Sequence, residues 1–166
     1  MKHPASEIMT SKLMTVHFEA PVSEAYELMK KCKIRHLPIV DDDGAVVGLM
    51  SDRDVQRAMK PKKNAASIED LSFEFDPSHE AKDFMSWPVR AVEQHESVIE
   101  VAQRMLDEKV SAFLVFTANR APVGIVTTDD LLKLLISLLQ KEPSRLNYTL
   151  TSLIDQFGVR PSLGYQ

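Results

Sequence analysis

A hydroxyl residue and an aspartate recur three residues apart at two places in the chain, each time after a glycine and two apolar residues. The two stretches are Gly48-Leu49-Met50-Ser51-Asp52-Arg53-Asp54 and Gly124-Ile125-Val126-Thr127-Thr128-Asp129-Asp130. Each is typical of a short buried strand that runs into a helix, whose unpaired N–H groups and dipole favour a phosphate. The hydroxyl would add a donor there, and the aspartate could accept hydrogen bonds from a sugar. The spacing therefore predicts a site for a phosphorylated sugar.

The same Ser/Thr-x-x-Asp spacing is also an ordinary helix cap, in which the aspartate bonds to the backbone at the helix start. A single occurrence would favour the cap. Two occurrences, each behind a glycine and an apolar strand, favour the ligand site. Both interpretations stay open at this stage.

The two junctions belong to a longer internal repeat. Segment 8–60 aligns with segment 84–136 at a constant offset of 76 residues and without a gap, so that Met9 falls on Met85 and Gly48 on Gly124. Two copies are too few for a solenoid, which stacks three or more repeats. The repeat instead predicts a pair of similar units related by a pseudo-twofold axis, each covering the apolar face of the other.

Each copy has the same order of expected elements, which makes the fold class α/β (α+β) with two tandem β-α-β-β-α repeats. An amphipathic helix is indicated by apolar residues at spacings of three and four. Extended apolar runs on either side of a turn indicate two strands. The elements expected in the first copy are a helical turn over 5–9, an extended piece over 13–16, a helix over 22–32, a strand over 37–40, the short strand at the junction and a helix over 55–59. Those in the second are 81–85, 89–92, a helix that begins near 98 with Ser97 as its N-cap, 113–116 and 131–139.

These elements divide the chain into four parts. Residues 1–60 form the first repeat, 61–80 an ordered linker, 81–140 the second repeat and 141–166 a tail with a possible short helix. The linker is expected to dock through its apolar residues, which are Ile68, Leu71, Phe73 and Phe75. The tail carries a stripe made of Leu146, Leu150, Leu153, Ile154 and Phe157.

Composition excludes several classes of protein. The net charge of -4 lacks the basic excess of a nucleic-acid binder, and the run Lys60-Pro61-Lys62-Lys63 is short enough to be a solvated face. No window reaches the roughly 20 apolar residues of a membrane span, and the N-terminus does not resemble a signal peptide. The single Cys32 indicates a reducing cytoplasm. Neither a catalytic triad nor a metal-ligand cluster is evident, so we expect no enzyme, catalytic cofactor or metal.

Several further residues carry a resemblance to a known family. They are Val22-Ser23-Glu24-Ala25 on the first helix, Ile34-Arg35-His36-Leu37-Pro38-Ile39-Val40 at the central strand, and the two junctions. In this order, over roughly residues 1–140, the chain resembles a CBS domain pair, also called a Bateman module, in a stand-alone protein. The resemblance implies a regulatory or energy-sensing module that binds an adenine nucleotide (AMP, ADP or ATP). It also implies a homodimer and a regulated protein partner.

In CBS pairs two clefts form between the copies, and the resemblance assigns residues to each. The first cleft would use Arg35, Ser51, Arg53, Asp54, Arg90, Val110 and Ser111. The second would use Lys12, Met14, Ile34, Arg35, His36, Ser111, Thr127, Asp129 and Asp130. Arg35 could reach a phosphate in either cleft, because a guanidinium binds two phosphate oxygens at once. Arg35 and His36 could equally be a surface pair beside a strand.

The second copy departs from the pattern in ways that predict unequal sites. Ser111-Ala112 replaces Arg35-His36, and Asp129 adds a carboxylate that would repel phosphate unless it turns away. One site could therefore stay empty or take another adenosyl ligand, such as S-adenosylmethionine or NAD. A module that binds no ligand and only dimerises is the remaining alternative.

Overall fold

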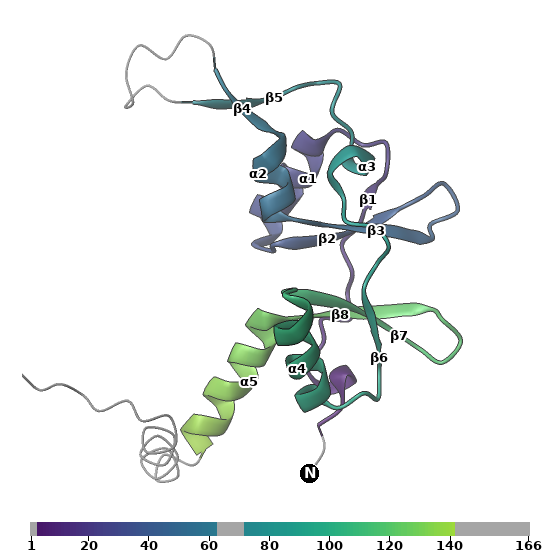
Figure 1. The fold of residues 1–166 in the computed structure, drawn as a ribbon, viewed down its shortest axis with the longest axis vertical. Helices are drawn as coiled ribbons and strands as arrows, with labels where there is room; N and C mark the ends of the chain where they lie inside the picture. Colours follow the sequence, from purple (N-terminus) through teal and green to yellow (C-terminus); the bar gives the residue numbers. More distant parts are fainter. Residues whose placement is uncertain (1–2, 63–71, 142–166) are drawn as a thin grey trace, which may run out of the picture.

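The computed structural model of the chain describes residues 3–62 and 72–141. Figure 1 shows two similar halves stacked along the long axis of the molecule, each a small sheet with two helices on one side. The predicted docking of Ile68 and Leu71 and the predicted helix of the tail lie outside the described residues.

The two halves have the same element order, as the repeat predicts. The first contains β1 (Val16–His17), α1 (Val22–Cys32), β2 (His36–Val40), β3 (Val46–Ser51) and α2 (Asp52–Ala58). The second contains β6 (Ala91–Glu93), α4 (Val98–Glu108), β7 (Ala112–Phe116), β8 (Pro122–Thr127) and α5 (Thr128–Lys141). In each half the central strand pairs in parallel with the first strand and antiparallel with the third. The predicted α+β class with two β-α-β-β-α repeats is confirmed.

The registers of the two sheets are equivalent. His36 lies opposite Ser51 in the first sheet, and Ala112 lies opposite Thr127 in the second. The hydroxyl at each junction is therefore the last residue of its strand and faces the first residue of the central strand. This pairing fixes where each strand ends and each following helix begins.

Some expected boundaries differ from the observed ones. Helix α2 ends at Ala58 rather than Met59, because Met59 begins β4 (Met59–Pro61), which pairs antiparallel with β5 (Phe73–Phe75). Pro61 disfavours a helical conformation at Lys60, and the pairing of Met59 with Phe75 ends the helix one residue earlier. Both second helices begin three residues before their predicted starts, and α5 extends to Lys141. The first strands are shorter than expected and begin at Val16 and Ala91.

The linker contributes to the first half through its second part. The ring of Phe75 lies 5.3 Å from that of Tyr26 on α1, whereas Phe73 is exposed. Of the two phenylalanines expected to dock, only Phe75 does.

The short segments that precede the repeats pack on opposite halves. The 3-10 turn Ala5–Glu7 lies on the second half, where the Ala5 N–H donates to the Glu96 carbonyl at 2.8 Å. Helix α3 (Ala81–Phe84) lies on the first half, where the Ala81 N–H donates to the Ala20 carbonyl at 2.8 Å. Each half is thus completed by chain that, in sequence, precedes the other half.

A shared apolar core joins the halves. Ala112, Leu114 and Ile125 of the second sheet are buried together, and Leu13, Val46 and Leu49 of the first half pack against them. Each copy therefore covers an apolar face of the other, as expected from the repeat. Among the helices in the described ranges, none has the length and apolar character needed to cross a membrane.

Candidate functional site

The first junction forms a helix cap. Ser51 is the N-cap of α2, and both its backbone N–H and its hydroxyl donate to Oδ2 of Asp54 at 2.7 Å. Arg57, one turn further on, donates from Nη2 to the other carboxylate oxygen of Asp54 at 2.5 Å. The Asp54 carboxylate is therefore buried and held in one orientation.

The second junction repeats this geometry. The Thr127 N–H and hydroxyl donate to Oδ2 of Asp130 at 2.9 and 2.7 Å, and Lys133 Nζ lies 3.1 Å from Oδ1. The capping alternative is thus realised in both copies. It does not withdraw the aspartates from the cavities described below, because each lines one of them.

The first amide of each of the two helices is also occupied. The Asp52 N–H donates to the Arg35 carbonyl and the Thr128 N–H to the Ser111 carbonyl, both at 3.0 Å. These amides are not free for a phosphate. Of the helix-end N–H groups predicted to contribute, the first in each helix is therefore excluded, and the side chains become more important.

A cavity of about 640 Å³ lies between the halves at the first junction. Of the residues assigned to the first cleft, those that line it are Ser51, Arg53, Asp54, Arg90, Val110 and Ser111. Arg35, which was also assigned to the first cleft, does not line this cavity. Its guanidinium instead pairs with Asp129 beside the second cavity, 2.5 Å away.

A smaller cavity of about 130 Å³ lies at the second junction. The assigned residues that line it are Lys12, Met14, Ile34, Arg35, His36, Thr127, Asp129 and Asp130. Ser111, which was assigned to both clefts, lines the larger cavity and not this one. The two cavities differ in volume, and the predicted difference in ligand binding stays a prediction. Asp129 does not stand unpaired beside a phosphate site, because Arg35 neutralises it.

Sequence reasoning missed several basic side chains in the cavity walls. Arg57 and Lys109 line the larger cavity, and Lys33 and Lys133 line the smaller one. A signal was available for Arg57 and Lys133, since each lies three residues after a junction aspartate and so on the same helix face. Lys109 gave no such signal. It is the C-cap of α4 in the left-handed conformation (φ 56°), so its position depends on where that helix ends.

His36 lines both cavities and joins the halves. Its Nε2 lies 2.9 Å from Oγ of Ser111. Burial lowers the pKa of His36 below its usual value, although the nearby Asp52 carboxylate opposes this effect. The imidazole is therefore held mainly in its neutral form at the wall between the two cavities.

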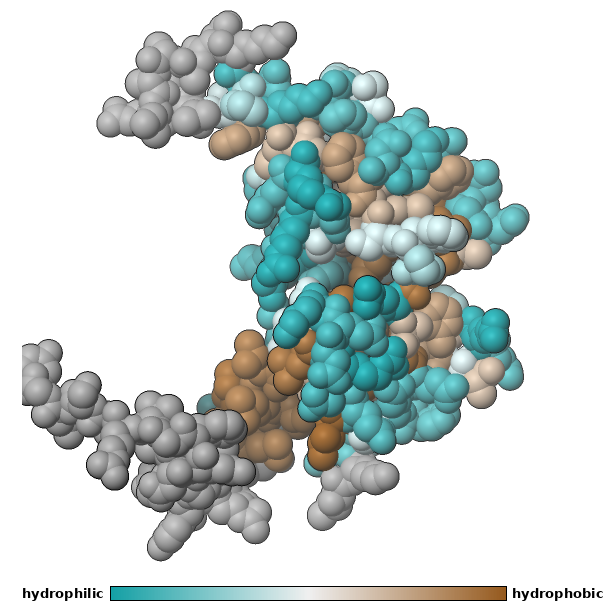
Figure 2. Space-filling view, viewed as in Figure 1, coloured by the Kyte–Doolittle hydropathy of each residue, from teal (hydrophilic) through white to brown (hydrophobic). Residues whose placement is uncertain are grey.

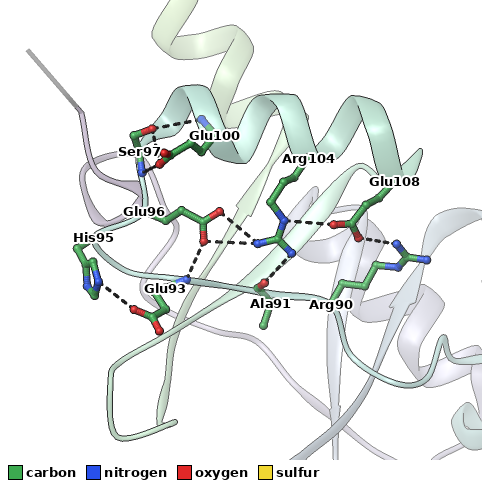
Figure 3. Close-up of polar contacts among 9 residues, drawn as sticks. All are labelled: Arg90, Ala91, Glu93, His95, Glu96, Ser97, Glu100, Arg104 and Glu108. Atoms are coloured by element: carbon green, nitrogen blue, oxygen red, sulfur yellow. Dashed lines mark hydrogen bonds and ion pairs between the residues drawn. The ribbon is translucent and has the colours of Figure 1, made fainter.

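A network in the second half positions Arg90 at the larger cavity (Figure 3). Arg90 donates to Glu108 at 2.6 Å, and Glu108 also accepts from Arg104, which in turn bonds to Glu96 and to the Ala91 carbonyl. Hydrogen bonds from Arg90 and then Arg104 lower the pKa of Glu108. Glu108 thus stays charged and holds Arg90 in place. Within residues 3–62 and 72–141, no group of His, Cys, Asp and Glu is arranged to hold a metal ion.

Comparison with known proteins agrees with this architecture. The family model for the CBS domain matches residues 5–61 and again 81–137. A CBS domain-containing protein of Dictyostelium discoideum is 29% identical over 147 residues, which is 86% of this chain and 98% of that protein. Other relatives are longer: the chain spans only 23% of a homoserine O-acetyltransferase from Methanosphaera stadtmanae, at 28% identity.

Two solved structures show the same fold. The CBS domain pair of protein MJ0100, in complex with 5'-methylthioadenosine and S-adenosyl-L-methionine, is 26% identical with a TM-score of 0.66, over 82% of this chain and 98% of that one. The cytosolic domain of the Mg2+ channel MgtE, in complex with ATP, is 25% identical with a TM-score of 0.59, over 79% of this chain and 48% of that one. The CBS domain model matches both halves of the chain, and the two matches correspond to the two copies of the repeat. This chain therefore belongs to the CBS domain family and carries a tandem CBS pair.

Proposed function

We propose that this CBS pair is a regulatory module that binds an adenine nucleotide (AMP, ADP or ATP) between its repeats and transmits occupancy to a partner protein. The observation that carries the proposal is the cavity of about 640 Å³, walled by both halves. Small-molecule sites are typically about 300–1,000 Å³. The second cavity, at about 130 Å³, is too small for a nucleotide unless its walls move.

The position of the larger cavity explains how binding would be sensed. Its walls come from α2 and β3 of the first half and from the segments before β6 and β7 of the second. A ligand that contacts both halves favours one relative arrangement of them, and a partner that distinguishes the arrangements responds to the ligand. A cytoplasmic location, expected from the single Cys32, stays a prediction.

The capped Asp54 still has room for a ribose hydroxyl. Each carboxylate oxygen has two lone pairs. Oδ2 accepts the N–H and the hydroxyl of Ser51, whereas Oδ1 accepts only from Arg57 among the described residues. One acceptor position therefore remains on Oδ1, and the cap would orient it for the sugar.

A second candidate ligand is S-adenosylmethionine. It is favoured by the MJ0100 pair, whose structure contains that ligand and 5'-methylthioadenosine. Both candidates contain adenosine and share the proposed ribose contact. We propose a regulatory role rather than catalysis, because the homoserine O-acetyltransferase is matched over less than a quarter of its length.

The test is calorimetry with AMP, ADP, ATP and S-adenosylmethionine on the wild-type chain and two variants. Asp54→Asn replaces one of the two carboxylate oxygens with an NH2 donor, so the cap and the ribose contact can no longer both be kept, and we expect at least a tenfold loss of affinity. Glu100→Gln weakens the analogous cap at Ser97, which lies outside both cavities, and should leave binding unchanged. The proposal fails if folded protein shows no heat with any of the four ligands, or if both variants lose affinity equally.

A further inference from the structure

We infer that the ligand of the larger cavity carries a polyphosphate, so that a nucleoside triphosphate or diphosphate binds in preference to a monophosphate or a cationic adenosyl ligand. The inference rests on the proposed function for the adenosine part of the ligand. It depends on the charged side chains in the cavity wall and not on the backbone N–H groups at the helix starts.

Basic side chains outnumber acidic ones in this wall. The basic residues that line the cavity are Arg53, Arg57, Arg90 and Lys109, and the acidic residues are Asp52 and Asp54. Two of the four cations already have partners: Arg57 pairs with Asp54, and Arg90 pairs with Glu108. Asp52 accepts from the Arg53 backbone N–H through Oδ1.

The other two cations have no partner among the residues that the structure describes. The Arg53 guanidinium and the Lys109 ammonium make no side-chain hydrogen bond or ion pair there, and both residues are exposed at the mouth of the cavity. Arg53 comes from the first turn of α2, and Lys109 from the end of α4 in the other half. Two cations without a side-chain partner thus line the cavity from different repeats, and Asp52 is the one wall carboxylate that no described cation pairs with.

An anion that contacts both cations bridges the two repeats, and a larger negative charge strengthens both contacts. Guanidinium and ammonium groups bind phosphate oxygens through charge-assisted hydrogen bonds. Each phosphate added to a nucleoside adds negative charge and length, whereas the sulfonium of S-adenosylmethionine is positive and would be repelled. Because the first amide of α2 is bonded to the Arg35 carbonyl, these side chains are the main source of phosphate recognition.

The inference predicts an order of affinities and a dependence on salt. ATP should bind more tightly than ADP and ADP more tightly than AMP, with roughly a tenfold gain across the series, and S-adenosylmethionine should bind most weakly. The gain should shrink as ionic strength rises, because both cations are solvent-exposed. Inorganic tripolyphosphate should compete with ATP.

The experiment is a calorimetric series with ATP, ADP, AMP, adenosine, S-adenosylmethionine and tripolyphosphate at low and high ionic strength. Arg53→Gln and Lys109→Gln should each weaken ATP roughly fivefold to tenfold and leave adenosine unchanged. Lys31→Gln removes the same charge from an exposed position on α1 outside the cavities and should change nothing. Thermal unfolding of each variant establishes that it is folded.

The outcomes separate this inference from the proposed function. AMP or S-adenosylmethionine binding as tightly as ATP, or Lys31→Gln weakening ATP as much as the two cavity variants, overturns the polyphosphate preference and leaves an adenosine site. If tripolyphosphate binds more tightly than adenosine and AMP, and neither of them displaces it, the adenosine part of the ligand is overturned. The cavity is then an anion site only. Absence of binding by every probe overturns both.

Discussion

At the scale of single residues, His36 is the side chain that the two cavities share. Its ring lies between them and contacts Ser111 of the opposite repeat. Arg35, its neighbour, makes the ion pair with Asp129 across the same boundary. Two consecutive residues therefore make these two side-chain contacts between the repeats. A ligand that disturbs either contact acts directly on how the repeats pack together.

His36 should make the protein less stable in mild acid. Burial lowers its pKa in the folded state, whereas the unfolded chain titrates near 6.5. Above that pH both states are neutral and His36 has no effect. As the pH falls below about 6.5, the unfolded state binds a proton that the folded state resists, so the free energy of unfolding falls until the folded pKa is reached.

Urea denaturation between about pH 8 and pH 5 measures this dependence. His36→Gln should flatten the acid side of the stability profile, and the matched change at the exposed His95, His95→Gln, should not. An unaltered profile in His36→Gln would show that the linkage lies elsewhere.

At the scale of elements, Gly48 and Gly124 lie where the third strand of each half packs against the segment that precedes the other half in sequence. A Cβ at Gly48 would lie 2.2 Å from the Met85 sulfur, and one at Gly124 would lie 2.6 Å from the Met9 sulfur and 2.9 Å from the Thr10 carbonyl oxygen. Thr10 and Ile125 are joined by two backbone hydrogen bonds at that point. Close approach of a neighbouring segment, rather than a turn, explains the glycine in both copies: the Met85 side chain at Gly48, and the Met9 side chain and Thr10 backbone at Gly124.

We expect Gly124→Ala to destabilise the fold by about 1–3 kcal/mol, as overpacking does. Gly48→Ala should destabilise it less, because the flexible thioether of Met85 can move whereas the Thr10 carbonyl is held by its hydrogen bond. Thermal unfolding of the two variants side by side makes the comparison. A larger loss in Gly48→Ala would contradict the explanation.

At the scale of the whole molecule, the two halves differ in the surface of their helices. Large apolar side chains are exposed on α4 and α5, namely Ile99, Leu106, Leu132, Leu135, Ile136 and Leu138. Figure 2 shows the hydrophobic surface over α5. Helix α2 of the first half, by contrast, has its Val55 and Ala58 buried. We propose that the predicted homodimer forms through the second repeat.

Leu135→Glu should weaken that dimer at least tenfold, because a charge placed in an apolar interface loses its hydration. Sedimentation equilibrium over a range of concentrations measures the change. Phe73→Glu alters an exposed apolar side chain of the first half and serves as the control. If the wild-type chain remains monomeric at every concentration, the proposed homodimer is wrong.

The sequence by itself determined the repeat, the order of elements and the hydroxyl and carboxylate residues of the two junctions, which line the cavities. These follow from local rules: the period of a strand and the cap of a helix fix where Ser51, Asp54, Thr127 and Asp130 lie. Only the tertiary structure decided that Arg35 turns to Asp129, that Lys109 joins Arg53, and that the two cavities differ in size. Arg35 and Asp129 are 94 residues apart in the chain. Contacts at that separation depend on how the two repeats pack together, and the spacing of residues within either repeat does not specify them.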